Sequence, residues 1–95
     1  MSIKYPVVHR WWLDFLTRVD LQEGCWYHFS LLWLDFIRFH APNQSISYKL
    51  WRQDLQHNLL PRCQFSNWGF EGLGSVRMVA PEELHRIFHA LYPLR

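Results

Sequence analysis

A five-residue pattern that occurs twice constrains the fold of this chain more than any other feature. Residues 12–16 read Trp-Leu-Asp-Phe-Leu, and residues 33–37 read Trp-Leu-Asp-Phe-Ile. On an α-helix, residues three and four positions apart share a face, so each copy has an aromatic stripe with its aspartate on the opposite side. The pattern therefore predicts two similar helices packed together. Substantial burial is expected for Trp12, Phe15, Trp33, Phe36 and Ile37.

Apolar spacing and end signals predict four helices along the chain. The first lies within 6–19, and the second spans 25–41 and is apolar on almost every side, which makes it the predicted buried centre of the domain. The third covers 45–60 after a serine cap, and the last begins at Pro81 and ends before Pro93. A competing interpretation treats the start of the third helix as a strand, because apolar residues alternate there.

The segment between the third and fourth helices predicts a β-hairpin. Residues 62–79 contain short alternating apolar stretches separated by glycines, which is typical of two strands and a turn. A chain of 95 residues has material for one hydrophobic core. We therefore predict a single domain over residues 1–95, of the mostly helical α+β class, with about four helices and one β-hairpin.

Targeting and membrane signals point to a cytoplasmic protein. The longest apolar stretch, residues 29–37, contains a serine and an aspartate and is much shorter than the roughly 20 residues that cross a bilayer. Residues 1–6 are not followed by the apolar segment of a signal peptide. Two cysteines provide no disulfide framework. We expect a cytoplasmic location and no membrane partner.

One combination of side chains has the spacing of a zinc site. Cys25 and His28 are three residues apart, and His85 and His89 are four apart, so each pair would point in one direction on a helix. The two pairs lie far apart in the sequence, and histidines occur all along the chain, so we expect no metal site and no cofactor. No nucleophile, base and oxyanion site can be assigned together either. The chain is therefore predicted to be non-enzymatic.

The aromatic content favours a protein-binding module. The chain has six tryptophans and seven phenylalanines, more than a small core needs. Neighbouring residues on a helix diverge by about 100°, so either Trp11 or Trp12 is expected near the surface. We predict a protein that acts by occupying the surface of another macromolecule, as an adaptor, an assembly subunit or an inhibitor of viral or mobile-element origin would. Alternatively, the aromatic side chains form the interface of a homodimer. The expected contacts are Trp11, Trp51, Trp68, Phe70 and Arg77.

A winged-helix-like nucleic-acid-binding protein is the alternative hypothesis. It uses the helix at 45–60 as the groove-facing element and the hairpin at 62–79 as the wing. Asp54 lies among the proposed contacts and the net charge is only +2, and both facts count against it. The groove-facing set would be Lys49, Arg52, Gln53, Gln56 and His57, with Arg62 and Arg77 on phosphates.

Overall fold

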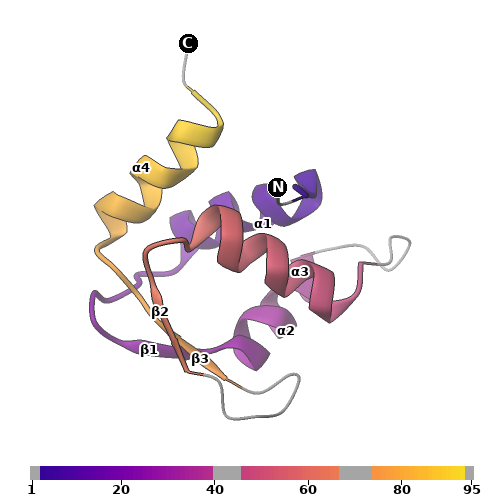
Figure 1. Cartoon of the computed structure of the whole chain (residues 1–95), viewed down its shortest axis with the longest axis horizontal. Coiled ribbons are helices and arrows are strands. Elements are labelled where there is room, and N and C mark those ends of the chain that lie inside the picture. Colours follow the sequence, from indigo (N-terminus) through magenta and orange to yellow (C-terminus); the bar gives the residue numbers. More distant parts are fainter. Residues whose placement is uncertain (1–2, 40–45, 67–73, 94–95) are drawn as a thin grey trace.

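The computed structural model describes residues 3–39, 46–66 and 74–93, which form four α-helices, a short π-helix and three strands (Figure 1). The predicted α+β, mostly helical fold class is confirmed. None of the helices in these residues is long and apolar enough to cross a membrane. In chain order the elements are α1 (Pro6–Arg18), β1 (Trp26–His28), α2 (Phe29–Phe39), α3 (Tyr48–Asp54), the π-helix η1 (Leu55–Leu59), β2 (Gln64–Ser66), β3 (Ser75–Arg77) and α4 (Pro81–Leu91).

The three strands form one antiparallel sheet in the order β1-β3-β2. The predicted hairpin between the third and fourth helices is confirmed as β2 and β3, whereas the expected apolar stretch at 68–70 lies outside the described residues. β1 was not predicted, because residues 25–28 were assigned to the second helix. Backbone hydrogen bonds join Gly24 and Cys25 to Met78, and Gly24 has the positive φ of 82° that favours glycine. Because residues 26–28 pair with β3 as a strand, the second helix begins only at Phe29.

α2 buries one side rather than its whole circumference. Phe29, Leu32 and Phe36 are buried, and Trp33 is half-buried against α3, where its ring meets those of Tyr48 and Trp51. The expected burial of Trp12, Phe15 and Phe36 is confirmed. The expectation for Ile37 is wrong, because it lies on the side of α2 that no element of the described chain covers.

Helices α1 and α2, which carry the two copies of the five-residue pattern, are joined by a shared arginine. The Arg18 guanidinium donates to the carboxylates of both Asp14 and Asp35, and the Trp11 indole N–H also donates to Asp35, over 2.8 Å. The hydrogen bond from Arg18 holds the pKa of the Asp35 carboxyl below its usual range. The sides of α1 and α2 that carry the two aspartates therefore meet at this polar cluster.

α3 begins at the predicted serine cap. The Ser47 hydroxyl accepts a hydrogen bond from the Leu50 backbone N–H over 3.2 Å, and the helix continues without a gap into η1. In η1 the Leu60 N–H reaches back five residues to the Leu55 carbonyl over 2.8 Å. The third helix is therefore confirmed over residues 48–59, and the competing strand interpretation is wrong.

Candidate nucleic-acid interface

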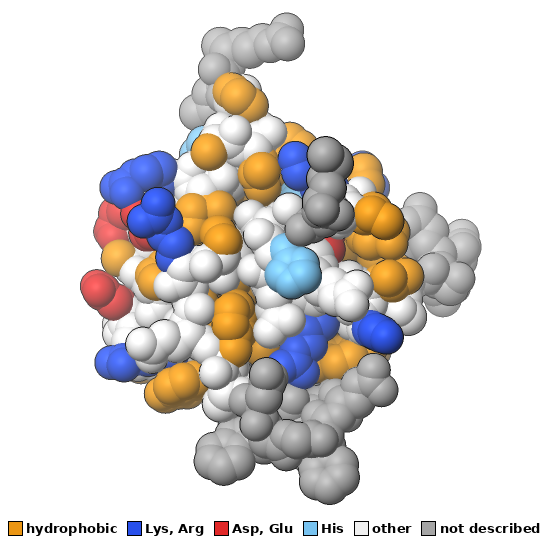
Figure 2. Space-filling view, in the orientation of Figure 1, with side chains coloured by type: hydrophobic (Ala, Val, Ile, Leu, Met, Phe, Trp, Pro, Cys, Tyr) orange, Lys and Arg blue, Asp and Glu red, His pale blue; other side chains and the backbone are white. Residues whose placement is uncertain are grey.

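The outer side of α3 and η1 carries a stripe of polar side chains. Lys49, Gln53 and His57 are exposed at four-residue intervals, and Arg52 and Gln56 are partly exposed beside them. This spacing places all five on one helix face. Figure 2 looks onto this side of the molecule, with basic and histidine side chains over α3 and the visible acidic side chains gathered mainly at the left margin. The structure therefore brings together all five predicted groove-facing residues.

Arg52 connects this face to the base of the hairpin. Its guanidinium lies 4.2 Å from the centre of the Phe29 ring and donates to the Tyr48 hydroxyl over 3.3 Å. It also lies so close to Gly74 that a Cβ at that position would approach the guanidinium to 3.0 Å. Because Gly74 directly precedes β3, the hairpin is fixed beside α3.

Asp54 does not contribute to the exposed face of α3. The residue is 1% exposed, and its side chain points into the protein. Its Oδ1 accepts hydrogen bonds from His9 Nε2 over 2.8 Å and from Asn58 Nδ2 over 2.7 Å, while Oδ2 accepts from the Tyr5 backbone N–H. The acidic residue that counted against nucleic-acid binding is therefore removed from the surface by an internal network.

This network joins three helices and was not predicted from the sequence. His9 on α1 contacts Asp54 through Nε2 and the Tyr92 hydroxyl through Nδ1, the latter over 2.9 Å. A neutral His9 protonated on Nε2 satisfies both neighbours if Tyr92 donates its O–H. Burial, together with the charge of Asp54, raises the pKa of Tyr92 and keeps the hydroxyl protonated. The partners lie 45 and 83 residues apart in the sequence, so no local pattern reveals the network.

Most of the predicted protein-binding residues do not lie on the described surface. Trp11 and Trp51 are 0% exposed, and so is Trp12, so the expectation that one of the adjacent tryptophans is near the surface is wrong. α1 contacts both α2 and α4, and its buried arc is therefore wider than the 100° between neighbouring residues. Arg77 is exposed on β3. Trp68 and Phe70 lie outside the described residues.

An apolar side of α2 was missed by the sequence analysis. Leu31, Leu34 and Ile37 are 60%, 45% and 43% exposed and follow at three-residue intervals. Their neighbours on this side are Ser30 and Arg38, both exposed, which was the available sign that this side faces water. The nearly continuous apolar sequence of this helix obscured that sign.

The proposed zinc ligands do not come together. Cys25 and His28 lie before and at the end of β1, not on a helix, whereas His85 and His89 are both on α4. No group of three or more metal-binding side chains occurs among the described residues, which include all four of these. Cys63 is half-buried, and burial raises the pKa of its thiol, which keeps it protonated and unreactive.

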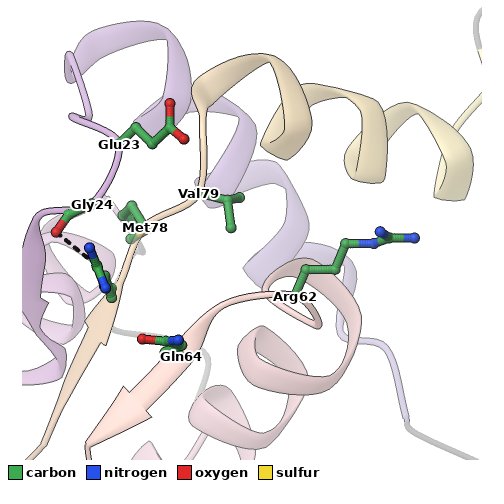
Figure 3. A pocket seen from close by; sticks show the side chains of 7 residues that line it. Glu23, Gly24, Arg62, Gln64, Met78 and Val79 are labelled. Atoms are coloured by element: carbon green, nitrogen blue, oxygen red, sulfur yellow. Dashed lines mark hydrogen bonds between the residues drawn. The ribbon is translucent and has the colours of Figure 1, made fainter.

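A shallow cavity of about 220 Å³ lies beside β2 and β3 (Figure 3). In Figure 3 the Arg62 side chain points away from Gly24 and Met78 on the far wall. The Arg77 guanidinium donates to the Gly24 carbonyl over 3.1 Å. The two arginines therefore do not converge on this cavity. Arg62 lies on the outer surface, with 74% of its side chain exposed, and its Nε is 3.6 Å from a carboxylate oxygen of Glu83.

Comparison with known proteins identifies no relative. No protein-family model matches the chain, and no curated protein or solved structure shows significant similarity to it. Surface chemistry is therefore the basis for assigning a function.

Proposed function

We propose that this protein binds nucleic acid through the outer face of α3 and η1, with the β2–β3 hairpin beside it. The observation that carries the proposal is the inward position of Asp54, which leaves cationic, amide and imidazole side chains on the face without an acidic neighbour from the same helix. Cations contact phosphates, and glutamines hydrogen-bond base edges. Arg62, exposed just after η1, adds a cation at the end of this face, and its charge is partly balanced by Glu83 at 3.6 Å.

The low net charge of the chain conceals an uneven distribution. Asp14 and Asp35 are bound by Arg18 between α1 and α2, whereas Glu83 on α4 pairs with both Arg86 and Arg62. Two acidic side chains are thus neutralised away from α3. A local excess of positive charge attracts a polyanion even where the sum over the chain is small.

Lys49→Ala is expected to weaken nucleic-acid binding for every sequence tested. Each phosphate that a cation of this face neutralises should contribute about −0.9 to the slope of the logarithm of the binding constant against the logarithm of salt concentration for duplex DNA. Removing Lys49 should reduce this slope by about 1. Fluorescence anisotropy of a labelled oligonucleotide across a salt series measures both quantities.

The matched control is Arg10→Ala, which removes an exposed cation from α1. This variant should keep the wild-type slope. Absence of salt-dependent binding by the wild type, or equal losses in the two variants, would show that α3 is not the binding face.

A second function, protein binding through α2, is favoured by the exposed apolar side of that helix. We infer that its occupant is a second copy of the chain. Leu34 is the sixth of the eleven residues of α2, and Leu31 and Ile37 lie three residues to either side. Under a two-fold axis two antiparallel α2 helices would place Leu34 against its equivalent and Leu31 against Ile37, as a self-complementary interface requires. Such a dimer would contain two copies of the α3 face.

Leu34→Glu is expected to abolish this self-association, because it places a charge at the centre of the apolar contact. Light scattering after size-exclusion chromatography over a concentration series should show the wild type moving from monomer to dimer, with the variant remaining a monomer. Leu13→Glu changes an exposed leucine on α1 and should leave the dimer intact. If the wild type stays monomeric at every concentration, α2 does not bind a second copy of the chain, and its partner would be a different protein.

A further inference from the structure

We infer that a hollow at the end of η1 binds one unstacked nucleobase, an inference that rests on the proposed nucleic-acid function. The hollow is open to solvent, has a volume of about 430 Å³ and is lined by Gln56, His57, Pro61 and Phe65. It lies where η1 and β2 approach each other, directly beyond the polar stripe of α3.

The two polar side chains of the hollow have the chemistry to read a base edge. The Gln56 carboxamide offers two donors and an acceptor, and a neutral His57 imidazole offers one of each. Neither side chain forms a hydrogen bond with any residue in the described parts of the chain. Both groups therefore remain available to a ligand.

Phe65 supplies an aromatic surface held in a defined orientation. Its ring lies nearly parallel to that of Phe29, at an interplanar angle of 19° and a centroid distance of 6.0 Å. Phe29 in turn carries the Arg52 guanidinium near its centre. Bases stack on aromatic side chains fixed in this way, and Pro61 provides a rigid apolar wall beside it.

The Phe65 ring favours a base that has left its stack. A base within a duplex has both faces covered by its neighbours and exposes only its edge in a groove, so it cannot stack on this ring. A base in a single strand, loop or bulge can rotate out and enter. Gln56 and His57 belong both to the hollow and to the polar stripe, so one strand could keep its phosphates on Lys49 while inserting a base.

The test measures the affinity of the protein for single-stranded homo-oligomers of each of the four bases and for duplexes of the same sequences. Each is tested as DNA and as RNA, to show which of the two supplies the base. The wild type should bind single strands more tightly than duplexes and should prefer one base. Phe65→Leu keeps the apolar volume but removes the π-face, and should lower single-strand affinity by roughly 5- to 150-fold. Gln56→Ala should reduce the preference among bases without changing the salt slope.

Two variants separate this inference from the function on which it rests. Because Phe65 is half-buried, circular dichroism must show that its variant folds; His57→Ala changes an exposed side chain and provides an independent measurement of the same site. Equal affinity for single strands and duplexes, with a folded Phe65→Leu variant unchanged but Lys49→Ala weakened, overturns the base site and retains nucleic-acid binding. Loss of salt-dependent binding by the wild type overturns both.

Discussion

Replacing Asp54 with alanine is expected to lower the free energy of unfolding by about 3–5 kcal/mol. The substitution removes the acceptor of three hydrogen bonds, from His9, Asn58 and the Tyr5 backbone. His9 is buried, so its Nε2–H would be left without a partner and without access to water. A domain of this size has a total stability of about 5–15 kcal/mol, so the loss would be a large part of it.

Urea unfolding followed by circular dichroism measures this loss. Asp14→Asn is the matched control, because Asp14 also pairs with a basic side chain but lies at the surface, where removal of an ion pair costs about 1 kcal/mol or less. Asp54→Asn keeps the size of the side chain and one acceptor oxygen, and should fall between the two. A loss below about 1 kcal/mol for Asp54→Ala would contradict the structural role of the network.

The helices were predictable because their signals are local. Ser47 caps α3 by a hydrogen bond within its own first turn, and Pro6 and Pro81 occupy first helical positions of α1 and α4, where their missing N–H is not needed. The five groove-facing residues were placed together correctly for the same reason, since helical periodicity alone sets their common face.

Apart from the exposed side of α2, the failures depend on contacts between distant residues. β1 is held by β3, about fifty residues further along, while its apolar sequence is equally compatible with a helix. The burial of Asp54 depends on His9, and the burial of Trp11 depends on helices that cover two sides of α1. Similarly, the hollow combines η1 with β2. No pattern within one segment contains this information.

Replacing Trp51 with alanine is expected to cost about 3–5 kcal/mol of unfolding free energy, the other large effect. The Trp51 ring lies at centroid distances of 5.7 Å from Trp11 on α1 and 5.3 Å from Trp33 on α2, and it also contacts Tyr48 within α3. These rings come from three helices, so their shared contact would become a cavity. The indole N–H has no acceptor among the described residues, and the loss is therefore one of packing.

Two further variants separate a core role from a binding role for Trp51. Trp51→Phe keeps a ring and loses no hydrogen bond, so it should retain more stability than Trp51→Ala. Trp26→Ala removes a tryptophan that is 50% exposed on β1 and should change the unfolding free energy by about 0.5 kcal/mol or less. If Trp51 were a surface anchor, its alanine variant would unfold like the Trp26 variant. The structure requires the opposite, because Trp51 joins α1 and α2 beneath the helix whose outer face carries the proposed nucleic-acid contacts.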